Sequence, residues 1–464
     1  MVDKKIDRYP STFTIDNFSS TTTLTPNDIK IPIGRKETLN EKQYDPYEHR
    51  TLEHPNTFSG ALIHILKSSM GTGILAIPMA FMYAGLVVGF IGTMLVGFLC
   101  AHTIHILVVA SQKMCIMEKR PSMGFSETAH AVFKYGPKAL RPWANFARLF
   151  VDVGLILTYF FGNAVYVVFI GDSLFQIKNH YFPDLDMGSQ TFMLILTVFL
   201  LFACQIRPLK FLVPFSAIAN VSMMVCFGIT AYYMTEELGS PDYKGMPSLA
   251  KGISGLPKFM VTVIFAMEGI GTILPVENSM VKSNFIGCPG VLNTAMVIIV
   301  FLFGSIGFFG YLVYGEDTKA SVTYNLKDED LAQVARGCIS LAVSLTFMLQ
   351  FYVPMEISWR YMHSYFSPKF HNLVQIVWRI IAVLFITVIA ISVPDLGTII
   401  DLVGAVFLAT LGLFVPAVLD LVVNWEDDLG IFKWKLYKNV LVMAISIFAS
   451  ISGVYFSLDS LFKS

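Results

Sequence analysis

Three ionisable side chains lie inside long apolar segments of the sequence. His64 and Lys67 share one segment, and Glu268 lies in another. An imidazole binds and releases a proton between pH 5 and 8, and a residue three positions away on a helix faces nearly the same side. A charge at the centre of a membrane helix costs about 2.5–3.5 kcal/mol, so ionisable groups kept there are functional candidates. Their chemistry would be the binding and transfer of a proton.

Glycine-rich interruptions accompany both sites. Residues 68–78 read SSMGTGILAIP and residues 268–275 read EGIGTILP, so each places a Gly-x-Gly ahead of an Ile-Leu pair and a proline. Either interruption alone could simply allow close helix packing. Two of them at corresponding places indicate an inverted-repeat transporter whose site lies at the bilayer midplane. Half-helix amides there could hold a carboxylate, and the opposing carbonyls a cation or an ammonium group.

Composition shows which elements must position these residues. Hydrophobic residues make up 55% of the 464 and charged residues only 14%, whereas soluble domains contain about 25% charged residues. The 33 basic residues balance the 33 acidic ones, which argues against a nucleic-acid-binding protein. A membrane helix needs about 20 apolar residues. Eleven runs meet this need: 58–82, 84–110, 145–171, 190–206, 210–234, 255–276, 291–314, 332–356, 374–393, 397–423 and 437–458.

The predicted fold is therefore an all-α polytopic membrane protein of eleven transmembrane helices. The runs are too long and too apolar on all sides for a β-barrel. Residues 1–57 are predicted to form a disordered cytoplasmic tail, and residues 58–235 and 255–423 two inverted repeats of five helices each, with helices one and six broken. Residues 437–458 form the eleventh helix. Lys and Arg are concentrated in the loops on the tail side, which predicts a cytoplasmic N-terminus and an extracellular or lumenal C-terminus.

Two long motifs resemble a known family. Residues 64–78, HILKSSMGTGILAIP, and residues 265–278, FAMEGIGTILPVEN, resemble the proton-coupled amino acid transporters of the amino acid/auxin permease family. Residues 44–50, YDPYEHR, are similar to its insect members, and the resemblance spans residues 45–460. It implies the five-plus-five inverted-repeat fold of the LeuT type. It also implies symport of small neutral amino acids, such as Gly, Ala and Pro, with protons and without another cofactor.

The resemblance also implies roles for the ionisable residues. His64 matches the proton-coupling histidine of the family's His-x-x-Lys motif, although a neutral core histidine is the structural alternative. Lys67 could act as a fixed cation where sodium-coupled relatives hold sodium, pair with a carboxylate, or snorkel. Glu268 could receive the substrate ammonium, neutralise Lys67, shuttle the proton, or hold the helix break open. Glu277 is expected to tie the end of its helix to the following loop, and His102 to play a structural role.

The predicted substrate site uses the backbone at the two breaks. The substrate carboxylate would bind the amides of residues 71–73, and its ammonium the carbonyls of residues 265–267. Asn163, Ser344 and Thr346 are weaker candidates, because lone polar residues usually satisfy hydrogen bonds between helices. The predicted substrate-binding residues are Ser69, Gly71, Thr72, Gly73, Tyr159, Phe265, Ala266 and Met267.

Other chemistry has no motif here. The chain contains no Gly-x-x-x-x-Gly-Lys-[Ser/Thr] loop, Cys-x-x-Cys pair, His-Glu-x-x-His or Gly-x-Ser-x-Gly, so neither an enzyme nor a metal site is expected. Family members often carry a disulfide between the outer loops after helices three and five. Residues 172–190 and 235–254 contain no Cys, so that bridge cannot form.

Two other functions remain open from the sequence. An amino acid sensor would report substrate occupancy to a cytoplasmic growth-signalling partner through the long tail, with little transport. A channel is less compatible with broken helices in two inverted halves. The sequence favours neither the plasma membrane nor the lysosomal or late endosomal membrane.

Overall fold

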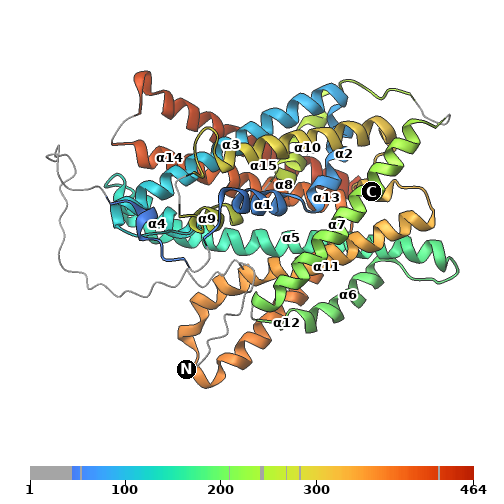
Figure 1. The fold of residues 1–464 in the computed structure, drawn as a ribbon, viewed down its shortest axis with the longest axis horizontal. Coiled ribbons are helices and arrows are strands. Elements are labelled where there is room, and N and C mark those ends of the chain that lie inside the picture. The colour runs from blue at the N-terminus through green and yellow to red at the C-terminus, as the bar shows by residue number, and fades with distance from the viewer. Residues whose placement is uncertain are drawn as a thin grey trace, which may run out of the picture.

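The computed structural model describes residues 44–463, except 53–54, 208, 241–244, 268, 282–283 and 427–428. Every regular element in these residues is helical, apart from one isolated bridge between Asn56 and Met280. Figure 1 shows the long helices packed into a bundle, with α1 and α8 near its middle. The predicted all-α fold is confirmed.

Most helices of the bundle match the predicted apolar runs. The first half contains α1 (Phe58–Ser69), α2 (Thr72–Ala84), α3 (Leu86–Glu118), α4 (Phe125–Tyr135), α5 (Ala144–Tyr181), α6 (Ser189–Ala203) and α7 (Leu209–Leu238). The second half contains α8 (Leu256–Met267), α9 (Ile270–Asn278), α10 (Val291–Tyr314), α11 (Asp330–Met362), α12 (His371–Ser392), α13 (Leu396–Val403), α14 (Val415–Asn424) and α15 (Trp434–Lys463).

These helices make the chain a multi-pass membrane protein. Nine helical stretches in the described part of the chain are long and apolar enough to cross a bilayer, or ten if the bent pair of α1 and α2 counts as one span. The α6 helix is apolar but shorter. Large apolar side chains such as Phe98, Phe202 and Ile451 are more than two-thirds exposed on the outside of the bundle. Water would penalise such exposure, whereas lipid favours it.

Both predicted interruptions break their helices. The α1 helix ends at Ser69 and α2 begins at Thr72, with a 56° bend between them. The α8 helix ends at Met267 and α9 begins at Ile270, after Gly269 in a non-helical conformation. A break leaves the first amides of the new helix without intrahelical partners. No side chain caps the start of either α2 or α9, and at α2 the amides of Thr72 and Gly73 face the break at the bundle centre.

The α2 and α8 helices meet backbone to backbone at the level of the breaks. A Cβ atom at Gly73 would lie 2.6 Å from the Cα of Ala266, which is closer than side chains pack. A third irregular helix packs against α8. It is a π-helical stretch of residues 404–414 between α13 and α14. Extra residues in a helical turn commonly mark functional sites. This stretch was not predicted, since its apolar sequence resembles that of a regular membrane helix.

Helix ends also differ from the prediction. The α3, α5 and α11 helices extend past the apolar runs that predicted them, because their charged and polar ends continue the helix outside the lipid. The amphipathic α4 helix lies in the loop between α3 and α5 and packs its apolar face on α5. A search for long apolar runs cannot find a helix of that kind.

Gly73→Ala should destabilise the bundle. The added methyl group meets backbone atoms that cannot rotate away, so we expect a loss of about 1–3 kcal/mol, the usual cost of overpacking. Thermal unfolding in detergent would measure it. Gly228→Ala on α7 is the control, because a Cβ there meets no atom within 4 Å. Equal unfolding temperatures for the two variants would contradict the close approach.

Candidate functional site

A cavity of about 100 Å³ lies between the two helix breaks. Its walls come from the α1–α2 and α8–α9 breaks, from α5, from Gln350 on α11 and from the π-helical stretch. Its polar lining consists of Ser68, Ser69, Thr72, Thr158, Tyr159, Asn163, Tyr166, Thr272 and Gln350. Among the described residues, no Asp, Glu, Lys, Arg or His lines this cavity. The arrangement suits a small, polar molecule without net charge.

Most of the predicted substrate-binding residues meet at this cavity. Its lining includes Ser69, Gly71, Thr72, Gly73, Tyr159, Phe265 and Ala266. Met267 is the exception: it is buried and lines a separate cavity of about 20 Å³ beside Cys100 and Thr103. Its carbonyl position next to the break was the reason for predicting it. The structure thus brings the predicted residues together, and their binding of substrate stays a prediction.

Several cavity hydroxyls already donate their protons to nearby backbone. Ser68 donates to the carbonyl of Ile65 at 2.8 Å, and Thr272 to that of Gly269 at 2.8 Å. Thr158 donates to the carbonyl of Gly154 at 2.8 Å. These hydroxyl groups can still accept a hydrogen bond from a ligand. Donors for an anionic group must therefore come from elsewhere, and the uncapped amides of α2 are suitable.

Two of the predicted proton-coupling residues, His64 and Lys67, do not line the cavity. His64 is half-buried on α1, and the Lys67 ammonium, on nearly the same side of that helix, donates a hydrogen bond to Ser216 of α7. Glu268 lies outside the described residues. Neither His64 nor Lys67 therefore touches a ligand in the cavity as the structure stands.

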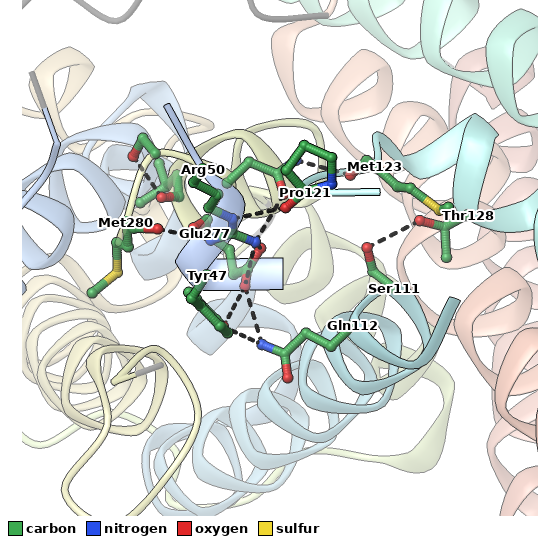
Figure 2. A network of polar contacts seen from close by, with 12 residues as sticks. Tyr47, Arg50, Ser111, Gln112, Pro121, Met123, Thr128, Glu277 and Met280 are labelled. Carbon is green, nitrogen blue, oxygen red and sulfur yellow. Dashed lines mark hydrogen bonds and ion pairs between the residues drawn. The ribbon is translucent and has the colours of Figure 1, made fainter. Parts of the chain in front are cut away.

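A second polar network surrounds the far end of α9 (Figure 2). Arg50 and Glu277 form an ion pair of 3.0 Å, with side chains only 2% and 1% exposed. Tyr47 donates from its hydroxyl to Glu277 at 2.6 Å, and Gln112 of α3 donates to the same oxygen at 3.0 Å. Arg50 also donates to the carbonyls of Glu277 and Met280, each at 2.8 Å. We call Tyr47, Arg50, Gln112 and Glu277 the tail latch.

The tail latch changes two expectations. Glu277 was expected to tie α9 to the following loop, but among the described residues its carboxylate bonds to residues before the first helix and to α3. Residues 46–49 of the predicted disordered tail form a 3₁₀ helix instead, while residues 1–43 lie outside the described residues. Burial, together with the charge of Glu277, raises the pKa of Tyr47 well above its ordinary value, so this phenol stays protonated and donates.

Sequence reasoning missed this network because its partners are far apart in the chain. More than 220 residues separate Arg50 from Glu277. A signal was nevertheless present, since Arg50 closes the YDPYEHR segment that resembles other proteins.

A cavity between two broken helices in an all-helical membrane bundle defines the class of secondary transporters. Residues 54–458 match the family described as transmembrane amino acid transporter protein. The chain belongs to this family.

Two relatives agree with the family. The chain is 36% identical to the proton-coupled amino acid transporter-like protein pathetic of Drosophila melanogaster, over 92% of this chain and 90% of that protein. It is 25% identical to the probable amino acid transporter skat-1 of Caenorhabditis elegans, over 89% of this chain and 94% of that protein.

Solved structures support the fold. The manganese transporter of Eremococcus coleocola superposes with a TM-score of 0.52 at 14% identity, covering 89% of this chain and 91% of that one. Mhp1, a nucleobase-cation-symport-1 family transporter, superposes with a TM-score of 0.50 at 14% identity, covering 91% and 94%. Both have the LeuT type of fold. Identities this low support the fold alone.

Glu277→Gln should destabilise the protein strongly. The substitution leaves the buried Arg50 guanidinium without its counter-charge, and breaking a buried pair costs about 3–5 kcal/mol. The paired change Arg50→Met/Glu277→Leu should recover most of this loss, because it removes both charges together. Thermal unfolding of the three proteins in detergent would measure the difference.

Glu236→Gln provides the control for this comparison. Glu236 pairs with Lys327 at 2.9 Å on the surface, where both side chains are more than one-third exposed. Exposed pairs contribute little, so its unfolding temperature should barely change. An Arg50–Glu277 pair that behaved like this surface pair would contradict the structural role of the tail latch.

Proposed function

We propose that this protein is a proton-coupled symporter of small neutral amino acids, such as Gly, Ala and Pro, into the cytosol. The observation that carries the proposal is the cavity of about 100 Å³ between the two helix breaks, lined by five glycines and no ionic side chain among its described residues. A cavity of this size suits a small amino acid. Proton coupling is supported by the name of the Drosophila relative.

The proposed architecture has eleven membrane helices. In it, residues 58–235 and 255–423 are inverted repeats of five helices, and residues 437–458 form the last helix outside them. The α6 helix would be the fourth span although it has only 15 residues. The equivalent positions of the α1–α2 and α8–α9 breaks support the repeat, since each opens its half of the chain. The tail would face the cytosol and the C-terminus the outside or lumen.

The proposed substrate pose follows from the dipoles at the breaks. The carboxylate binds the amides of Gly71, Thr72 and Gly73 at the start of α2, where partial positive charge gathers. The ammonium group binds carbonyls at the end of α8, near Phe265 and Ala266, where partial negative charge gathers. In the structure the Gly71 amide donates to the carbonyl of Ser69 at 3.0 Å, so the carboxylate would share this donor while binding the amides of Thr72 and Gly73.

The proposed coupling separates the proton from the substrate. His64 takes up a proton from the acidic side and releases it to the cytosol. Because His64 does not line the cavity, its charge would act on the substrate through the position of α1. Lys67 would hold the fixed positive charge that makes a sodium ion unnecessary, with its ammonium on Ser216. Glu268 would be the third proton-coupling residue beside His64 and Lys67.

Two membranes are compatible with this function. An acidic outer surface and an acidic lysosomal lumen both supply an inward proton gradient. Imaging of the tagged protein beside plasma-membrane and lysosomal markers would assign one of them.

His64→Ala should abolish acid-stimulated uptake. Without the imidazole no group on α1 binds and releases a proton near neutral pH, so an inward proton gradient should no longer drive transport. The measurement is uptake of labelled alanine into proteoliposomes, with and without an inward pH gradient. His363→Ala, an exposed residue after α11, is the control and should behave as the unaltered protein does.

Three results would count against the proposed function. Normal acid-stimulated uptake by His64→Ala would remove this residue from the coupling. Alanine binding without uptake by the unaltered protein would favour a sensor. Ion conductance without saturation would favour a channel.

A further inference from the structure

A buried amide on α5 has no partner although it lines the cavity. Asn163 is 1% exposed, and neither its Nδ2 nor its Oδ1 atom bonds to any described residue. A buried polar group without a partner loses its hydration without compensation, and native proteins hold few of them. A group of this kind in a cavity wall indicates that a bound ligand supplies the missing hydrogen bonds.

The position of Asn163 indicates which part of the ligand it meets. The proposed pose uses the α1–α2 break for the carboxylate and the α8–α9 break for the ammonium. Asn163 stands on neither broken helix but on α5, the third wall of the cavity. It is left to contact the substrate side chain.

We propose that Asn163 is a specificity-determining residue that hydrogen-bonds the side-chain hydroxyl of small substrates such as serine and threonine. This inference rests on the proposed function and extends its substrate class. An amide offers two donors and an acceptor, and a hydroxyl group can donate to one and accept from the other in a small space. The hydroxyls of Ser68, Thr158 and Thr272 donate to backbone carbonyls instead, so they can only accept.

Two pairs of isosteric substrates test the inference. Serine differs from 2-aminobutyrate, and threonine from valine, by a hydroxyl in place of a methyl group. The unaltered protein should prefer the hydroxylated member of each pair by about tenfold or more in competition with labelled alanine, because the analogue leaves Asn163 unpaired. Asn163→Leu, which keeps the shape of the side chain, should remove this preference by lowering the affinity for serine.

Thr93→Val is the matched control. The Thr93 hydroxyl is also buried without a partner among the described residues, but it does not line the cavity, so this variant should keep the preference. An equal loss of serine and 2-aminobutyrate binding in Asn163→Leu would show that Asn163 contacts the substrate main chain and would overturn the inference. Equal affinities for serine and 2-aminobutyrate in the unaltered protein would overturn it too. Failure of the proposed function is distinct, because alanine uptake would then be absent from every variant.

A separate observation carries a second inference, about the half-helices that border the cavity. The α1 helix ends at the first break and α9 begins at the second. Hydrogen bonds join the start of α1 to the end of α9. Asn56 lies just before α1 and Ser279 just after α9. The backbone N–H of Asn56 donates to the Ser279 carbonyl at 2.9 Å, and its side-chain Nδ2 donates to the Ser279 hydroxyl at 2.8 Å. The tail latch adds the ion pair of Arg50 with Glu277.

We also infer that the tail latch is a gate that keeps the tail side of the cavity closed between transport cycles. A substrate can leave on that side only when the half-helices around it part, and parting α1 from α9 breaks these contacts. Gln112 extends the restraint, because it holds Glu277 against α3. This inference assumes the alternating access of the proposed function, but it predicts separately how often the tail side of the cavity opens.

Tyr47→Phe weakens the latch without leaving a charge unpaired. It removes the hydrogen bond that the Tyr47 hydroxyl donates to the Glu277 carboxylate, and bonds to charged groups are stronger than bonds between neutral ones. In a protein with serine at its native cysteine positions, Thr272→Cys would report access to the cavity. An impermeant maleimide added on the tail side should label this cysteine about tenfold faster when Tyr47 is Phe, and label it no faster from the other side.

Tyr44→Phe is the control, because Tyr44 stacks on His49 and lies outside the latch. It should label at the rate of its parent. A folded Tyr47→Phe protein with an unchanged labelling rate would overturn the gate. Since labelling reports opening without any transport, it stays informative even if the proposed function fails.

Discussion

Lipid offers no hydrogen-bonding partner to an open backbone, and this constraint shapes the whole molecule. Helices can stop inside a membrane only where protein or a polar cavity satisfies the freed groups. Here α1 and α8 stop at the centre of the bundle, and the amides that follow α1 have no side-chain cap. Close packing of Gly73 on Ala266 brings the two breaks together. The cavity is therefore a consequence of where the glycines interrupt the helices.

Neutrality distinguishes the cavity from the residues around it. Its described lining offers hydroxyls, amides and backbone groups. His64 and Lys67 lie on α1 outside this lining, and the ion pair of Arg50 and Glu277 lies at the end of α9. In a medium of low dielectric constant, a full charge beside the substrate would bind one end of a zwitterion too tightly to release it. Partial charges at helix ends avoid that problem. Ionic groups can then control the movement of the helices instead of holding the substrate.

Local sequence signals predicted the parts that depend on short stretches of chain. Apolar runs predict the spans because the bilayer requires each helix to be long and apolar by itself. Gly-x-Gly followed by proline predicts the breaks because these residues disfavour a regular helix over a short stretch of chain. Met267 lines the neighbouring cavity because it is one residue further along α8 than Ala266. The partners of Glu277 could not be predicted, since a contact over more than 220 residues depends on the complete fold. The sequence could not single out Asn163, because only the structure shows that its amide has no partner among the described residues.

The tail latch also determines where this chain can be shortened. The part that matches the family begins at residue 54, four residues after Arg50. A fragment cut at that boundary would include every membrane helix yet leave the Glu277 carboxylate buried beside Gln112 without its cation. The compact unit for expression and crystallisation therefore begins before Tyr47, and fusion partners belong upstream of that residue.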